Sequence, residues 1–207
     1  MSERKALFDD WAATYDATLK DTAGFPFEGH ERVLAEVVGK AGVGIEATVL
    51  DVGTGTGALA ARLAVLDCRV LGVDLSEKML ARARQKVPAA DFRQLDLLGD
   101  WGDLETCRFD AVVSAYVLHE FDVPSKVDIL TRFAKLLEPG GRVVVGDISF
   151  ETALARDAAR QRWREVWDEG EYYWVAEHAV PALHSVGLSV HYHQLSFCAG
   201  VYVLQPQ

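Results

Sequence analysis

Three glycines and one acidic residue have the spacing of a nucleoside-binding site. Gly53, Gly55 and Gly57 follow the apolar run 47–52, and Asp74 closes the next apolar run, 21 residues after Gly53. A glycine turn has no side chains, so backbone N–H groups and the start of the next helix can approach a ligand closely. A carboxylate at the end of the second run can accept hydrogen bonds from both ribose hydroxyls, but it repels a phosphate. The pattern therefore predicts a turn that binds the nucleoside part of a cofactor.

The same residues fit two other interpretations. The stretch GTGTGA at 53–58 satisfies the dinucleotide fingerprint if Ala58 replaces the last glycine, and Asp74 would also suit NAD. Alternatively, the glycines could serve only a tight strand-to-helix turn that needs positive φ angles. A nicotinamide enzyme usually adds a second half-sheet and a catalytic domain, for which this chain leaves little room.

Apolar runs alternate with helical patterns through the middle of the chain. Strands are predicted at 47–52, 69–73, 90–94, 109–114 and 142–148, and helices at 57–66, 76–86 and 124–138. This alternation is typical of βαβ units, so we expect a doubly wound, Rossmann-like α/β fold. Its sheet would be mainly parallel and covered by helices on both faces.

Helices are predicted at both ends of this central pattern. Two of them, at 3–20 and 30–39, precede the first strand, and two more follow at 151–168 and 174–186. The last runs, 188–197 and 199–205, have a short link that favours an antiparallel pair. We expect a single domain over 1–207, with an N-terminal helical cap (1–27) and a helical lid insertion (150–187).

Composition excludes several classes of protein. The chain has 21 basic and 31 acidic residues, a net charge of -10, and no basic patch, so we expect no nucleic-acid partner. It has no apolar run long enough to span a membrane and no signal-peptide pattern, so we expect a cytoplasmic protein. Cys68, Cys107 and Cys198 are too scattered to indicate a disulfide framework or a zinc site.

Five motifs together resemble the class I S-adenosylmethionine-dependent methyltransferases. They are DVGTGTG at 51–57, the acid of GVDLS at 74, the acid of FRQLDL at 96, FDAVVSAYVLHEF at 109–121 and LLEPGGRVVVGD at 136–147. FDDWAATYD at 8–16 and EYYWVAEHAVPALHSVGL at 171–188 are similar to small bacterial members with no assigned substrate. The resemblance implies a seven-stranded sheet in the order 3-2-1-4-5-7-6, with strand 7 antiparallel.

The resemblance also implies a cofactor, S-adenosylmethionine (SAM), and residues that bind it. The implied cofactor-binding residues are Tyr15, Asp51, Gly53, Gly55, Gly57, Asp74, Leu75, Asp96, Leu97 and Ser114. The glycines would line the methionine part, Asp51 would steady the turn or reach the amino group through water, and Ser114 would face the methionyl tail. Asp74 would bind the ribose and Asp96 with Leu97 the adenine, although Asp96 could instead bond its own backbone. Tyr15 would close over the cofactor or pack beside Trp11.

The expected reaction is methyl transfer to a small-molecule acceptor, with S-adenosylhomocysteine (SAH) as the product. His119 follows the fourth strand and is the candidate catalytic base, with Glu120 and Tyr116 as weaker candidates. Alternatively, His119 is a helix-start residue bonded to backbone. Because Asp147 is followed by Ile148 rather than Asn, we expect no metal. The alternative functions are an NAD-dependent oxidoreductase and a catalytically silent SAM-binding module, and the protein would be a monomer or a homodimer.

Overall fold

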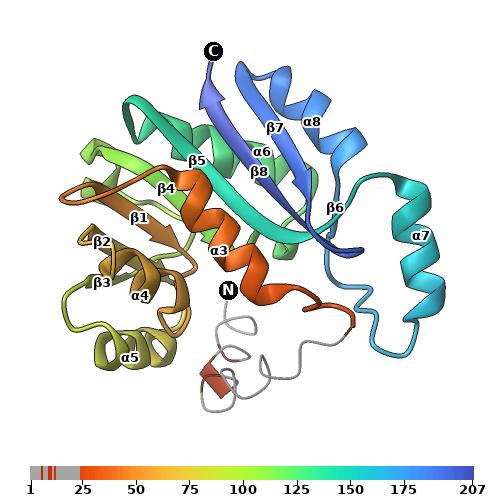
Figure 1. The fold of residues 1–207 in the computed structure, drawn as a ribbon, viewed down its shortest axis with the longest axis horizontal. Helices are drawn as coiled ribbons and strands as arrows, with labels where there is room; N and C mark the ends of the chain where they lie inside the picture. The colour runs from red at the N-terminus through yellow and green to blue at the C-terminus, as the bar shows by residue number, and fades with distance from the viewer. Residues whose placement is uncertain (1–5, 7–8, 11, 13–23) are drawn as a thin grey trace.

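The computed structural model describes Ala6, Asp9, Asp10, Ala12 and residues 24–207. One sheet runs through this part of the chain, with strands in the order β3-β2-β1-β4-β5-β8-β7 (Figure 1). The strands are β1 (Thr48–Val52), β2 (Arg69–Asp74), β3 (Asp91–Gln94), β4 (Phe109–Ala115), β5 (Leu137–Phe150), β7 (Leu188–Gln194) and β8 (Ala199–Pro206). β8 is antiparallel to both β5 and β7. The expected Rossmann-like order is confirmed once the two-residue β6 (Trp174–Val175), which pairs with β5, is left out of the numbering.

Helices cover the sheet on both faces. The helices α3 (His30–Ala41) and α4 (Ala58–Ala64) pack in one core cluster, and α6 (Val123–Lys135) and α8 (Ala176–His184) pack in the other. In Figure 1, α3 lies in front of the sheet and α6 behind it. The helix α5 (Glu77–Lys86) packs on β2 and β3. No helix in the described part of the chain has both the length and the apolar character that crossing a bilayer requires.

The predicted element boundaries were wrong in the second half of the chain. The helix predicted to run to residue 138 ends at Lys135, because β5 already begins at Leu137 and pairs there with Phe109. The helix predicted at 151–168 is the shorter α7 (Ala153–Arg162). Residues 174 and 175 form β6 instead of the start of a helix. This short strand pairs with the C-terminal end of β5. At residue 137 and at residues 174–175, a long-range strand pairing replaces the helix that the local pattern would allow.

Parallel pairing brings the ends of four strands to one edge of the sheet. Val52 is in register with Val73 on one side and with Ser114 on the other. Ser114 is in turn in register with Val145. The loops that follow β1, β2 and β4 therefore lie next to each other, with Asp147 of β5 beside them, and ligands bind at such an edge in open α/β sheets.

A glycine in β5 lets α3 pack directly against the sheet. A Cβ atom added at Gly146 would lie 2.5 Å from Val33 Cγ1 and 2.7 Å from Val37 Cγ2. Both valines are fully buried and β-branched, so they have few other rotamers. The helix cannot accommodate a methyl group at this position without shifting.

We therefore expect Gly146→Ala to lower the free energy of unfolding by about 1–3 kcal/mol, the usual cost of overpacking. Gly39→Ala is the matched control. Gly39 lies in α3, the helix that packs on Gly146, and a Cβ atom there meets nothing within 4 Å. The control should raise stability by roughly 0.5–1 kcal/mol, since alanine favours helix. Urea unfolding followed by circular dichroism measures both. A Gly146→Ala protein as stable as the parent would contradict this packing.

Candidate functional site

The glycine turn after β1 has the backbone that its sequence predicted. Gly53, Gly55 and Gly57 all have positive φ angles, of 64°, 55° and 87°. A Cβ atom at Gly53 would lie only 2.2 Å from Val117 Cγ2, so no other residue fits there. The turn is thus both strained for other residues and packed closely against the loop that follows β4.

Asp74 holds this turn in place. Its Oδ2 accepts a hydrogen bond from the Gly55 N–H at 2.9 Å, and its Oδ1 accepts one from the Ser76 N–H at 2.9 Å. Burial raises the pKa of Asp74, although these two N–H donors oppose the shift. The carboxylate is therefore fixed between the turn and the start of α5, where its remaining lone pairs can accept hydroxyl groups.

A cavity of about 250 Å³ opens beside Asp74. Its walls come from the ends of β1, β2, β3 and β4, and they are mostly apolar. The lining residues include Gly53, Gly55, Val73, Asp74, Leu75, Met79, Leu95, Asp96, Leu97, Tyr116, Val117 and Glu120. A flat aromatic group with a few polar edges suits such walls.

Asp96 bonds its own backbone and also lies at the wall of the larger cavity. Its Oδ1 accepts from the Leu98 N–H at 3.0 Å, which is the local turn bond expected of a loop-start aspartate. The residue also lines the cavity with Leu97. Among the described residues nothing donates to its Oδ2, which can therefore accept from a ligand.

Asp51 and His30 lie at a second, smaller cavity. Asp51 Oδ2 accepts from the Thr54 hydroxyl at 2.6 Å, whereas its buried Oδ1 has no hydrogen-bond partner among the described residues. Burial raises the pKa of Asp51 to about 7. The buried Nδ1 of His30 also lacks a hydrogen bond within the described chain. This cavity shares Gly53, Gly55 and Tyr116 with the larger one.

One predicted cofactor residue lies away from both cavities, and another is not among the described residues. Ser114 is buried, and its hydroxyl donates to the Val52 carbonyl at 3.0 Å, so it faces the neighbouring strand rather than either cavity. Tyr15 lies outside the described residues.

His119 is held by a buried carboxylate. It lies in the short 3₁₀ helix η2 (Leu118–Glu120), and its Nδ1 is 2.6 Å from Asp147 Oδ1. Its backbone N–H donates to Asp147 Oδ2 at 2.9 Å, and Trp174 Nε1 donates to the same oxygen at 3.0 Å. Burial lowers the pKa of His119, but Asp147 and the nearby Glu171 and Glu120 outweigh it, so the pKa is raised. The side chain is thus oriented by Asp147 and not by backbone alone.

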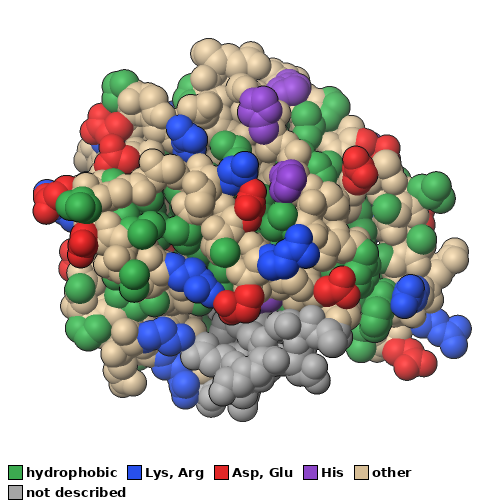
Figure 2. Space-filling view, in the orientation of Figure 1, with side chains coloured by type: hydrophobic (Ala, Val, Ile, Leu, Met, Phe, Trp, Pro, Cys, Tyr) green, Lys and Arg blue, Asp and Glu red, His purple; other side chains and the backbone are tan. Residues whose placement is uncertain are grey.

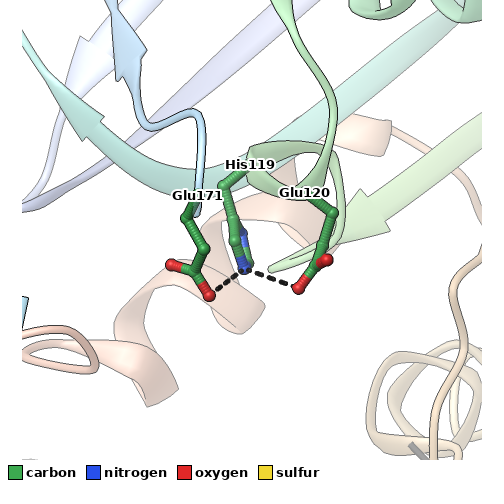
Figure 3. A group of neighbouring side chains, drawn as sticks. All are labelled: His119, Glu120 and Glu171. Carbon is green, nitrogen blue, oxygen red and sulfur yellow. Dashed lines mark ion pairs between the residues drawn. The ribbon is translucent and has the colours of Figure 1, made fainter. Parts of the chain in front are cut away.

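The other ring nitrogen of His119 faces two glutamates. His119 Nε2 lies 3.9 Å from Glu120 Oε1 and 3.7 Å from Glu171 Oε1. Figure 3 shows both carboxylates pointing toward this nitrogen, one from η2 and one from the segment before β6. Glu120 also lines the larger cavity, so this cluster lies next to it.

Sequence reasoning did not single out three features of this site. Glu171 is distant from His119 in the chain, and only the loop path brings them together. The hydrogen bond between Asp147 and His119 has no local sequence signal either, and neither does the burial of His30. Tyr116 was only a weak candidate base, yet it has a positive φ of 57°, which is rare for a residue other than glycine and common at functional sites.

Comparisons with known proteins agree with this geometry. The model of a methyltransferase domain family matches residues 49–141. An uncharacterized methyltransferase of Oceanobacillus iheyensis is 30% identical over 202 residues, which cover 92% of this chain and 91% of the relative.

Solved structures show the same fold. The complex of DhpI with SAM and HEP has a TM-score of 0.74 at 21% identity, covering 99% of this chain and 97% of that one. Magnesium protoporphyrin IX methyltransferase from Synechocystis PCC 6803, with bound SAH, has a TM-score of 0.73 at 19% identity, covering 100% and 99%. The family supports an adenosyl sulfonium rather than a dinucleotide at the glycine turn. The chain belongs to the class I S-adenosylmethionine-dependent methyltransferases, and its cofactor is S-adenosylmethionine.

Proposed function

We propose that this protein transfers a methyl group from SAM to a small-molecule acceptor bound beside His119 and Tyr173. The observation that carries the proposal is the pair of joined cavities, which share Gly53, Gly55 and Tyr116. One has the ribose-type acid Asp74 in its wall, and the other has polar groups for an amino-acid tail.

Two buried polar atoms of the smaller cavity that lack hydrogen bonds fit the methionine part of SAM, one of them His30 Nδ1, which lies 3.7 Å from Glu31 Oε1. Asp51 Oδ1 is a buried acceptor and His30 Nδ1 a buried ring nitrogen, and neither has a hydrogen-bond partner among the described residues. An amino acid carries an ammonium donor and a carboxylate acceptor. Burying such groups without partners costs free energy, so a ligand that satisfies both would bind favourably.

The larger cavity fits the adenosine part. Asp74 would accept the ribose hydroxyls, with Leu75 beside it, and the free oxygen of Asp96 would accept from the exocyclic amine of adenine. Met79 and Leu97 provide apolar surface for the base. Each hydrogen bond between a carboxylate and a neutral donor would contribute on the order of 1.5–3 kcal/mol.

Bound SAM supplies a methyl group on a positively charged sulfur, which keeps the electron pair of the broken C–S bond when an acceptor displaces it. The protein has to align the acceptor with that bond and exclude water. No covalent bond to the enzyme is needed. An acceptor that carries a proton must lose it, and His119 and Glu120 lie where they could hold or pass on that proton.

An aromatic cluster next to His119 would position the acceptor. Tyr173 lies 6.4 Å from His119 between ring centroids, 4.6 Å from Trp167 and 5.5 Å from Phe25. Such rings enclose a small organic molecule better than they bind a polyanion. On the face shown in Figure 2, basic side chains alternate with acidic ones, and among the described residues of that face no broad basic patch is present.

Incubation with labelled SAM and a fractionated bacterial extract tests the acceptor class. We expect enzyme-dependent label in a product of the small-molecule fraction, separated from SAM by chromatography. Label found only in nucleic acid or protein would contradict the proposal. SAH binding with no transfer to either fraction would instead support a catalytically silent module.

The placement of the ribose predicts the effect of one substitution. Asp74→Ala should weaken SAH binding by about 2 kcal/mol, roughly thirtyfold, because hydrogen bonds to the ribose are lost. Asp91→Ala is the control, since Asp91 is an exposed acid at the opposite end of β3. Isothermal titration calorimetry gives the affinities, and thermal unfolding checks that both variants are folded. Unchanged affinity in Asp74→Ala would place the ribose elsewhere.

The raised pKa of Asp51 predicts a pH dependence of binding. Burial raises this pKa to about 7, so the fraction of ionised Asp51 increases as the pH rises from 5.5 to 7. The ammonium of SAH stays protonated over this range, because α-amino groups titrate near 8. Affinity for SAH should therefore increase by roughly tenfold between these pH values. Asp51→Asn should remove the increase, and an equal slope in both proteins would exclude Asp51 as the ammonium partner.

A further inference from the structure

The imidazole of His119 is oriented so that one nitrogen is fixed and the other is available. Asp147 is bonded to Nδ1, so Nε2 is the nitrogen that faces Glu120 and Glu171 (Figure 3). The His119 side chain is only 9% exposed. Its Nε2 lies 3.9 and 3.7 Å from the two glutamate oxygens, distances that exceed a hydrogen bond. The free ring nitrogen of a nearly buried side chain is thus directed toward two carboxylates.

We propose that His119, Glu120 and Glu171 bind one divalent metal ion, such as Zn²⁺ or Mn²⁺. One ligand atom from each residue lies within 4.8 Å of the others. Ligands at about 2.1 Å from a single ion are roughly 3.0–3.4 Å apart, so the side chains need to move by less than an ångström or so. One imidazole and two carboxylates suit these ions, and three protein ligands leave a position open.

The contact between Asp147 and His119 has the form of a metal-site outer shell. A ligating histidine usually donates its second N–H to a carboxylate, which fixes the ring and makes the ligating nitrogen more basic. Asp147 is fully buried, and Trp174 Nε1 donates to its other oxygen at 3.0 Å. The direction of the His119 ring is therefore set before any ion arrives.

The segment that carries Glu171 is also held in place. The Tyr172 N–H donates to the His119 carbonyl at 2.7 Å, and this bond joins the segment before β6 to η2. Lys126 Nζ donates to the Tyr172 carbonyl on the other side of that residue. These bonds fix two distant parts of the chain around the same gap.

The charges favour a cation in the gap. Asp147, Glu120 and Glu171 surround the imidazole, and Lys126 is the cation that acts on Asp147. Among the described residues, these three carboxylates outnumber the cation Lys126 when the imidazole is neutral. A bound dication would reduce that excess and give Nε2 a partner.

A metal at this site would also limit which acceptors can be methylated. This part of the inference rests on the proposed function. Glu120 lines the cofactor cavity, so the open position of the ion would lie beside it. With the ion bound, His119 and Glu120 would hold the metal instead of the proton, and an acceptor hydroxyl on the ion would lose its proton to solvent more readily, because a metal lowers the pKa of bound oxygen. The resulting oxyanion would take the methyl group, and the sulfur would keep the electron pair. Acceptors with a metal-binding hydroxyl are therefore favoured.

Metal titration of the full-length protein tests the site directly. After EDTA treatment and removal of the chelator, we expect Co²⁺ to give saturable visible d–d absorption at one equivalent, and Zn²⁺ to displace it. Glu120→Gln and Glu171→Gln should each bind Co²⁺ at least tenfold more weakly. Glu165→Gln is the matched control, since Glu165 is an exposed acid before the same segment, and it should bind like the parent.

Several outcomes would overturn the metal site. They are the absence of saturable Co²⁺ or Zn²⁺ binding to the parent protein, unchanged affinity in both glutamate variants, and binding of methylammonium in place of any metal, which would indicate an amine-binding site. SAH titration of the same EDTA-treated protein separates the two proposals. SAH binding without metal binding overturns only the metal site, whereas metal binding without SAH binding overturns only the proposed function.

Discussion

The hydrogen bond from the Gly55 N–H to the Asp74 carboxylate ties the whole site together. It joins the turn after β1 to the end of β2, at 2.9 Å, across the opening of the cavity. The glycine backbone can follow this path because Gly53, Gly55 and Gly57 all adopt positive φ angles. Without these positive φ angles, the backbone N–H groups of the glycine turn and the Asp74 carboxylate could not both face the same ligand.

Asp51 of β1, Asp74 of β2 and Asp147 of β5 lie near this edge of the sheet, and their surroundings differ. Burial raises the pKa of Asp51 and of Asp74. Burial also acts on Asp147, but His119 and Lys126 outweigh it and lower its pKa. Asp51 and Asp74 line the two cavities, whereas Asp147 is bonded to His119 and orients it. Similar side chains at neighbouring strand ends therefore have different chemistry because of what surrounds each one.

Local patterns predicted much of the fold and several residues that line the larger cavity. Glycine spacing, the acid that closes β2 and the short link between the last two strands are all readable within a few residues. The partners of His119 were not readable, because Asp147 lies 28 positions away and Glu171 is brought in by a loop. The same limit applies to α7, which ends at Arg162 although charged helical residues continue beyond it. Ser114 has the expected place on its strand, but a bond to Val52 decides where its hydroxyl points.

A crystal structure of the protein with SAH tests the central claim most directly. The account predicts ribose hydroxyls within hydrogen-bond distance of Asp74, adenine against Leu97, and the amino-acid tail between Asp51 and His30. SAH bound at another surface, or in this cavity with its ribose turned away from Asp74, would contradict it.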